Sequence, residues 1–232
     1  VHDLRENRET PRATLGQMVS LFDRWLLPEV SYLPSVLERL EIFGQCVPVT
    51  MIGYDALPMT DPGNYRFVPG LGANVSEYFR NLARADSVVC ISEYSRLAIL
   101  DHLRRDRTRQ TVVASPGGDH IPTRAKLPRE SSAPVSFIRL GTMEMRKKPL
   151  EILRGFCRAV DAGTAAELTF VGKPNASANQ VNEEVQSRID QGYPIIWIQD
   201  ATDSEVWDLV HRADIFLSIG LEGFGIPVLE SI

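Results

Sequence analysis

Two glutamates near the end of the chain flank a glycine-rich turn that could bind an extended polar ligand. Gly223 and Gly225 let the backbone turn tightly and approach a bound molecule closely, and Pro227 suits the first turn of a helix. Amides at such a helix start favour phosphates and sugar hydroxyls. The segment reads Glu222-Gly223-Phe224-Gly225-Ile226-Pro227-Val228-Leu229-Glu230. The two carboxylates could each bind a different pair of hydroxyls. Alternatively, the turn is only a common α/β connection and the helical glutamate only complements the helix dipole.

A second candidate segment places three consecutive cations between a predicted strand end and a predicted helix start. Arg146, Lys147 and Lys148 follow Gly141, where the backbone can approach a ligand closely, and precede Pro149. Anions such as phosphates bind well between a strand end and a helix start. A charge run is also typical of an ordinary solvated surface. Its place on the binding edge of a parallel sheet favours the anion site.

The second half of the chain alternates strands and helices, which predicts a parallel, doubly wound sheet. A capping box, Thr202 with Glu205, marks the start of its last full helix. The apolar patterns predict strands at 135–140, 168–171, 195–198 and 215–219, and helices at 149–160, 179–189 and from 203.

In the first half of the chain, the pattern predicts helix over 15–43, broken by Pro28 and Pro34. Strands and helices are then predicted to alternate as in the second half. Ser92 is predicted to cap one of its helices. We expect a loop over 1–14, a Pro- and Gly-rich loop over 61–72, strands at 47–52, 87–91 and 111–114, and helices at 75–83 and 93–103.

Tyr54 and Asp55 directly follow the predicted strand at 47–52. Polar residues at the carboxyl end of a strand in an open α/β sheet commonly face a ligand. Asp55 could equally form a turn by accepting hydrogen bonds from local amides. Both interpretations stay open.

Composition excludes several classes of protein. The net charge of −5 over 232 residues argues against a nucleic-acid partner. No apolar run approaches the roughly 18 residues that span a bilayer. Three widely spaced cysteines, Cys46, Cys90 and Cys157, predict neither a zinc site nor a disulfide framework. A reducing, cytoplasmic compartment fits best.

The segment from Glu222 to Glu230 resembles the E-x7-E signature of retaining, nucleotide-sugar-dependent glycosyltransferases of the GT-B fold, the family 4 group. The segment from Gly141 resembles the family's Gly-Thr-x-Glu-x-Arg-Lys-Asn element, in which Arg and Lys hold the donor diphosphate. Lys148 stands where that element has Asn or Gly, and we assign it no role.

Three shorter segments also resemble the family: Tyr54-Asp55 with Pro58, the run from Ala85 to Ser95, and the turn from Pro116 to Asp119. The last departs from the pattern, because Gly118 replaces a common hydrophobic residue. The resemblance covers 47 to the end and is strongest from 135.

The resemblance implies the GT-B fold, which is α/β with two Rossmann-like, doubly wound parallel-sheet domains facing a cleft. We expect an acceptor-side domain at 1–125, a linker at 126–134 and a nucleotide-sugar-binding domain at 135–232. Family members carry more sheet before Tyr54 and continue past the second glutamate, so both domains are expected to be incomplete here.

The resemblance also implies a hexosyltransferase that retains configuration. It would move a hexose from GDP-mannose or a UDP- or dTDP-hexose to a saccharide or lipid-linked acceptor, as bacterial polysaccharide mannosyltransferases do. The predicted catalytic residues are Glu222, Arg146 and Lys147, and the predicted substrate-binding residues are Gly141, Gly223, Phe224, Gly225, Glu230, Tyr54 and Asp55. Within the family, Arg146 and Lys147 would hold the diphosphate, Glu222 the donor sugar and Glu230 the ribose.

No D-x-D motif occurs, so we expect no metal and no cofactor besides the nucleotide-sugar substrate. The expected setting is the cytoplasm, with peripheral association at the inner face of the plasma membrane as a further expectation from analogy. Two alternatives stay open: a nucleotide-sugar-binding fragment or module without transferase activity, and a GT-B-like epimerase, for which the necessary extra acid/base residues were not found.

Overall fold

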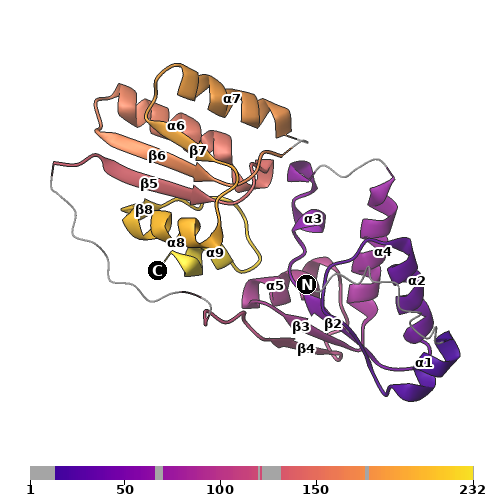
Figure 1. Cartoon of the computed structure of the whole chain (residues 1–232). Helices are drawn as coiled ribbons and strands as arrows, with labels where there is room; N and C mark the ends of the chain where they lie inside the picture. The colour runs from indigo at the N-terminus through magenta and orange to yellow at the C-terminus, as the bar shows by residue number, and fades with distance from the viewer. Residues whose placement is uncertain (1–13, 66–69, 120, 122–131, 176–177, 232) are drawn as a thin grey trace, which may run out of the picture. The chain divides into compact units, whose positions relative to one another are not determined.

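The computed structural model describes residues 14–65, 70–119, 121, 132–175 and 178–231. It divides into two compact units, Val1–Tyr54 with Val68–Val113 and Asp55–Phe67 with Ala114–Ile232 (Figure 1). Residues 1–13 and 66–69 of the predicted loops, and most of the predicted linker 126–134, lie outside the described residues. The predicted domain boundaries therefore stay predictions.

The first unit contains a four-stranded parallel sheet in the order β1-β2-β3-β4. Its strands are β1 (Trp25–Leu27), β2 (Val49–Gly53), β3 (Ser87–Cys90) and β4 (Gln110–Val113), and its helices are α1 (Leu15–Leu21), α2 (Pro34–Phe43), α4 (Leu71–Arg84) and α5 (Glu93–His102). The spatial order of these strands follows their order in the chain, and α2 packs against α4. The strands predicted at 47–52, 87–91 and 111–114 are confirmed within one or two residues.

The prediction of helix over 15–43 is wrong at Trp25–Leu27, which forms β1. Trp25 pairs with Val49 of β2, and its ring stacks on Phe43 with centroids 4.2 Å apart. A three-residue apolar run carries no period of its own, so pairing with β2 decides its conformation. The loop predicted over 61–72 is also interrupted, by the short helix η1 (Pro62–Asn64) and by the start of α4 at Leu71.

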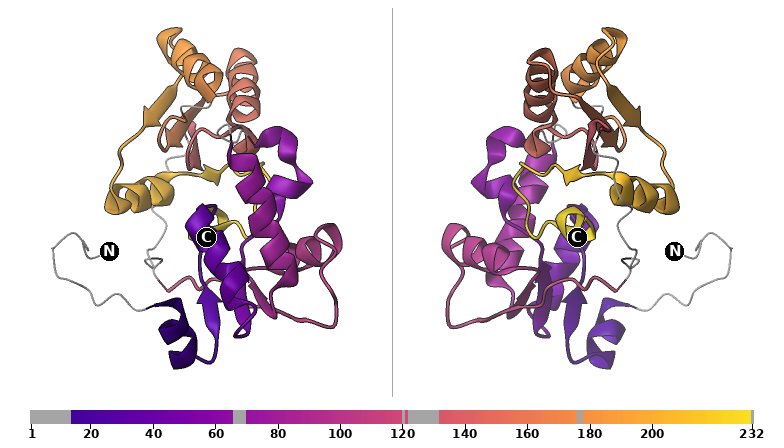
Figure 2. Two further views of the ribbon diagram at one scale, coloured as in Figure 1. Left: turned by 90° about the vertical axis from the view of Figure 1, so that its right-hand side faces the viewer. Right: turned by 90° about the vertical axis from the view of Figure 1, so that its left-hand side faces the viewer.

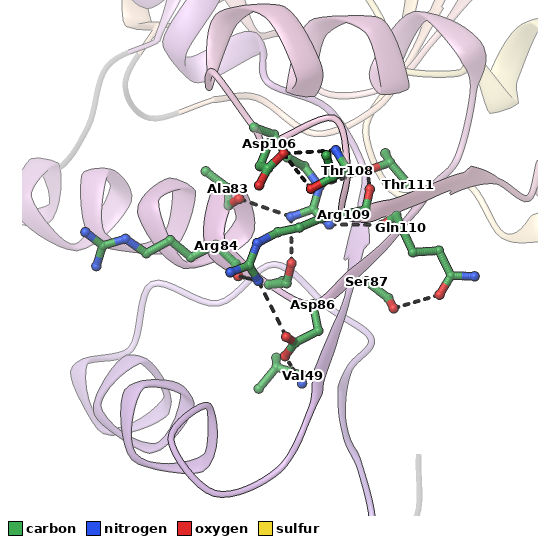
Figure 3. A network of polar contacts seen from close by, with 12 residues as sticks. Val49, Ala83, Arg84, Asp86, Ser87, Asp106, Thr108, Arg109, Gln110 and Thr111 are labelled. Carbon is green, nitrogen blue, oxygen red and sulfur yellow. Dashed lines mark hydrogen bonds and ion pairs between the residues drawn. The ribbon is translucent and has the colours of Figure 1, made fainter.

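Polar side chains at the amino edge of this sheet bind backbone groups. Asp86 accepts a hydrogen bond from the Val49 amide at 2.8 Å, and Arg109 donates to the Arg84 carbonyl at 2.6 Å (Figure 3). Arg105, only 3% exposed, donates to Thr111 Oγ1 at 2.8 Å and to four carbonyls. Those carbonyls belong to Leu82, Ala83, Ala85 and Gln110, at 2.7–3.3 Å. These side chains fasten the end of α4 to the strand starts.

The second unit contains a parallel sheet in the order β7-β6-β5-β8. Its strands are β5 (Val135–Leu140), β6 (Ala166–Val171), β7 (Ile195–Ile198) and β8 (Ile215–Phe216), and its helices are α3 (Leu57–Thr60), η1, η2 (Met145–Lys147), α6 (Pro149–Asp161), α7 (Asn179–Asp190), α8 (Asp203–Arg212) and α9 (Ile226–Glu230). The chain moves from β5 outward to β7 and then returns to the other side of β5, so this sheet is doubly wound.

Two apolar clusters cover the two faces of the second sheet. One joins α6 and α7 to β6 through Leu153, Phe156, Val181, Leu168 and Phe170, and the other joins α8 to β5 and β6. In Figures 1 and 2, α6 and α7 lie side by side on one face and α8 on the other. The predicted helices are confirmed here, including the capping box at Thr202 and Glu205.

Two of the three cysteines are buried, and the predicted Ser92 cap is confirmed. Cys90 and Cys157 are buried free thiols, and Cys46 is exposed. Ser92 accepts a hydrogen bond from the Ser95 amide at 3.0 Å. The strand predicted at 215–219 ends at Phe216, because the chain after it turns toward the loop that follows β5.

Candidate functional site

The candidate site lies where strand order reverses in the second sheet, between β5 and β8. Ile138 of β5 pairs with Phe216 of β8, so the loops that follow these two strands leave the same edge side by side. Ligands of open α/β sheets bind at such a switch point, outside the carboxyl ends of the strands. One loop carries the predicted cations and the other carries Glu222.

Three glycines allow the loops at this edge to cross at main-chain contact distance. Gly141 has φ +110°, and a Cβ on Gly172, at φ +146°, would lie 2.1 Å from the Gly141 carbonyl oxygen. A Cβ on Gly220 would lie 2.7 Å from the Arg146 carbonyl oxygen and 2.8 Å from Lys147 Cα. The loops after β5, β6 and β8 therefore pack directly against one another, and a residue larger than glycine would not fit at 172 or 220.

Arg146 and Lys147 both form ion pairs with Glu222, and Arg146 also pairs with Glu144. Arg146 Nη1 lies 3.2 Å from Glu222 Oε2, and Lys147 Nζ lies 3.5 Å from Glu222 Oε1. Arg146 Nε lies 2.8 Å from Glu144 Oε2, and the Thr142 hydroxyl donates to Glu144 Oε1 at 2.6 Å. The side chains of Arg146, Lys147 and Glu222 keep 18–26% exposure, so solvent reaches a cluster of charges held on backbone loops.

Contacts within the cluster shift the pKa values of Glu144 and Arg146 toward their charged forms. Burial raises the pKa of Glu144, but the Thr142 hydroxyl and the cations Arg146 and Lys147 outweigh burial, and the pKa lies below its usual value. Burial lowers the pKa of Arg146, but Glu144 and Glu222 outweigh it and raise that pKa. The cluster can therefore meet an anion with fixed positive charge at neutral pH.

The glycine-rich turn after Glu222 has the geometry predicted for it. Gly223 is buried, Gly225 is the left-handed N-cap of α9 at φ +85°, and Pro227 lies in the first turn of that helix. Phe224 is half-buried, and Glu230 is the last residue of α9. The structure thus brings Glu222 against both cations, while a role for Phe224 or Glu230 in binding remains a prediction.

Tyr54 and Asp55 directly follow β2, Tyr54 in the first unit and Asp55 in the second. The Tyr54 hydroxyl donates to the Pro28 carbonyl at 2.9 Å, and Ser95 Oγ donates to the Tyr54 carbonyl at 2.6 Å. Asp55 accepts a hydrogen bond from the Leu57 amide at 3.0 Å, and burial raises the pKa of its carboxyl. The turn-forming interpretation of Asp55 is confirmed, and its contact with substrate remains a prediction.

Several residues of the site lie outside the predicted set. Glu144, Gly172 and Gly220 stand next to the predicted residues, and their position after strand ends is the signal that could have identified them. Arg139 is the one charged residue of β5 and is buried, which is itself unusual. Lys148 adopts the left-handed conformation at φ 49°. That conformation suits Asn or Gly, the residues usual at this place in the resembling element.

Among the described residues, no group of three or more His, Cys, Asp and Glu side chains is arranged to hold a metal ion. Within the same residues, no helix is long and apolar enough to cross a membrane.

Solved structures align with nearly the whole chain, and a curated protein is similar in sequence over less than half of it. The serotype-specific mannosyltransferase WbdA of Escherichia coli is 34% identical over 109 residues, which are 46% of this chain and 13% of that protein. Anabaena Alr3699/HepE, solved with UDP and glucose, aligns with a TM-score of 0.66 at 14% identity, over 94% of this chain and 59% of that one. The UDP-forming α,α-trehalose-phosphate synthase of Burkholderia vietnamiensis aligns with a TM-score of 0.64 at 12% identity, over 94% and 57%. No protein-family model matches the chain.

These alignments show that the chain has the α/β architecture of GT-B glycosyltransferases, as the sequence predicted, and that it spans just over half of their length.

Proposed function

We propose that the chain is the donor-binding core of a glycosyltransferase that moves a hexose from a nucleotide-diphosphate sugar to a saccharide or lipid-linked acceptor. The observation that carries the proposal is the cluster of Arg146 and Lys147 with Glu222 at the switch point of the second sheet. The GT-B architecture and the similarity to a mannosyltransferase support the same reading and favour a mannose donor. The proposed setting is polysaccharide assembly at the cytoplasmic membrane face.

The proposed chemistry uses the two cations to stabilise the leaving group. As the bond between sugar C1 and the phosphate oxygen breaks, its electron pair stays on the nucleoside diphosphate, next to Arg146 and Lys147. Fixed cations lower this barrier because they need no reorganisation during the reaction. The acceptor hydroxyl forms the new bond to C1 on the same face, and its proton passes to the departing phosphate, which gives retention of configuration.

Glu222 has two partners to exchange in this scheme. In the structure Glu222 forms ion pairs with both Arg146 and Lys147, and an incoming diphosphate would compete with it for these cations. Glu222 would then be free to bind a hydroxyl of the donor sugar, with the Gly223–Gly225 turn beside it. We propose that Glu230 binds the nucleotide ribose, that Tyr54 and Asp55 contribute from the end of β2, and that no metal is required.

A second candidate is a nucleotide-sugar-binding module that has no transferase activity on its own. The observation that favours it is coverage, because the chain spans 13% of the mannosyltransferase and 57–59% of the solved glycosyltransferases. Both candidates share the donor site and differ only in turnover.

Calorimetric titration with UDP, GDP and dTDP, each with and without EDTA, tests the donor site. We expect one nucleotide to bind without dependence on EDTA. Binding should be lost in Arg146→Ala/Lys147→Ala and weakened in Glu230→Ala. Arg154→Ala is the matched control, because Arg154 pairs with Glu184 on the outer surface of α6 and α7. Donor hydrolysis and sugar transfer by a chain that binds would separate the transferase from the module. Nucleotide binding that persists in Arg146→Ala/Lys147→Ala would contradict the assignment of these two residues to the donor site.

A further inference from the structure

Arg139 is a buried cation beneath the candidate site. It lies in β5, one residue before the strand end, and is 2% exposed. Together with Lys147 and Glu222 it lines a small cavity of about 20 Å³ at the switch point. Burial lowers the pKa of its guanidinium to about 10, while Glu144 and Glu222 act in the opposite direction. The cation is therefore close enough to the cluster for the cluster's charges to act on it.

The guanidinium holds the backbone of the loop that carries the two predicted cations. Nη1 donates to the Gly141 carbonyl and contacts Met143 Sδ at 3.9 Å, and Nη2 donates to the Thr142 carbonyl at 2.8 Å. Gly141 is also in contact with Gly172, where no Cβ fits. The buried guanidinium of Arg139 thus binds two consecutive carbonyls of this loop.

Arg139 also adds a positive charge to the site. The cluster otherwise consists of Arg146 and Lys147 facing Glu144 and Glu222, which cancel in net charge. With Arg139 these five side chains carry a net charge of +1, and Asp55 is a further carboxyl that interacts with Arg146 and Glu222. A buried charge is screened less by solvent and salt than an exposed one, so its field reaches an anion in the adjacent loops.

The geometry points to Arg139 as a positioning residue for the donor diphosphate: it orders the Gly141–Thr142 backbone, and its added positive charge favours displacement of Glu222 from Arg146 and Lys147 by a diphosphate. This inference rests on the proposed function and deepens it.

The test measures nucleotide affinity of the whole chain with Arg139→Lys and Arg139→Gln. Lysine keeps the charge but loses the planar fork, whereas glutamine keeps hydrogen-bond donors but loses the charge. Titrations use UDP and GDP, with uridine and guanosine as probes that lack the diphosphate. Arg105→Gln is the matched control, because Arg105 is equally buried and binds carbonyls at the amino edge of the other sheet.

We expect Arg139→Gln to weaken diphosphate binding about tenfold and Arg139→Lys by about threefold, with nucleoside binding unchanged in both. Arg105→Gln should leave diphosphate affinity unchanged. Equal affinities of the glutamine variant and the unaltered chain, or an equal loss in Arg105→Gln, would overturn the role of Arg139 alone. Absence of nucleotide binding by the unaltered chain would overturn the proposed function itself. If the glutamine variant does not fold, the lysine variant alone decides. An equal loss of affinity for the nucleosides and for UDP or GDP in Arg139→Lys would then overturn the inference.

Discussion

The amino edge of the first sheet and the carboxyl edge of the second both gather charged side chains, but they use them differently. At the first edge, Arg105 and Arg109 donate to backbone carbonyls and Asp86 accepts from a backbone amide. At the second, Arg146 and Lys147 pair mainly with the side chains of carboxylates.

The difference separates structural charges from charges available to a ligand. A backbone carbonyl cannot leave its place without unfolding the element that carries it, so the cation bound to it is committed to the fold. A glutamate side chain can rotate away at little cost when a stronger anion arrives. Arg139 combines both behaviours, because its donors are committed to carbonyls while its field acts on the exchangeable cluster.

The largest expected effect comes from removing the two buried arginines separately. Arg105→Met removes the arginine donor from four carbonyls. Arg139→Met removes it from two, of which the Thr142 carbonyl still accepts from the Glu144 amide at 2.8 Å. A buried carbonyl left without a donor costs about 1–3 kcal/mol, so we expect the larger loss of unfolding free energy for Arg105. Amide hydrogen exchange read separately for each sheet would measure it. If Arg105→Met lowered the protection of amides equally in both sheets, Arg105 would not be specific to the structure of the first sheet.

Gly220→Ala sharpens the comparison at the second edge. The added methyl would overlap the main chain of Arg146 and Lys147, which cannot move as a flexible side chain does. Overpacking of about 1–3 kcal/mol should separate the loops and weaken UDP or GDP binding about tenfold. Gly155→Ala is the control, because Gly155 is exposed on α6 and has no atom within 4 Å of an added Cβ. Nucleotide titration of the two variants should differ clearly, and equal affinities would remove the steric argument.

Much of the fold follows from local patterns in the sequence. Apolar runs and caps predict most strands and helices of the second unit, and Gly223, Gly225 and Pro227 predict the turn before α9. Each of these signals acts within a few residues of the structure that it specifies. The cations after β5 are predictable for the same reason, since a strand end and a helix start are themselves visible.

The remainder depends on contacts between distant segments. β1 forms because Trp25 meets Val49, and β8 stops at Phe216 because Gly220 meets Arg146. Neither partner is adjacent in sequence, so no local pattern reports the contact. The pairing of Glu222 with Arg146 belongs to the same class, as it joins residues 76 positions apart. Lys148 is different, because its left-handed backbone was indicated only by the Asn or Gly of the resembling element.

Asp86 and Asp214 test whether the two sheets share a structural device. Each follows an alanine, precedes a strand, and accepts from the amide near the start of the neighbouring strand, Val49 at 2.8 Å and Ser136 at 2.9 Å. Asp86→Ala and Asp214→Ala should each destabilise their own unit by about 1–2 kcal/mol, the cost of an unpaired amide. Hydrogen exchange of each unit measures it. An effect confined to one variant would show that only one sheet depends on this contact.

Lys148→Gly should stabilise the start of α6 without a new contact. Lys148 holds φ 49° and ψ 46°, a conformation that costs a residue with a Cβ about 1 kcal/mol and glycine almost nothing. We expect a higher melting temperature and unchanged nucleotide affinity, which would also support leaving Lys148 without a role in the site. Weaker binding in this variant would instead make Lys148 part of the phosphate site.

Glu144→Gln gives the smallest expected effect and shows whether the cluster pairs are exchangeable. The pKa of Glu144 lies below 4.5 in the folded chain, so its contribution to stability is present above pH 4.5 and is lost as pH falls through the lowered pKa. With its side chain 32% exposed, we expect a contribution of about 0.5–1 kcal/mol at neutral pH. Unfolding free energy measured against pH should fall less steeply on the acid side for the variant. A loss of several kcal/mol at neutral pH would mean that Glu144 is committed to the fold as Arg105 is, and the distinction between the two edges would fail.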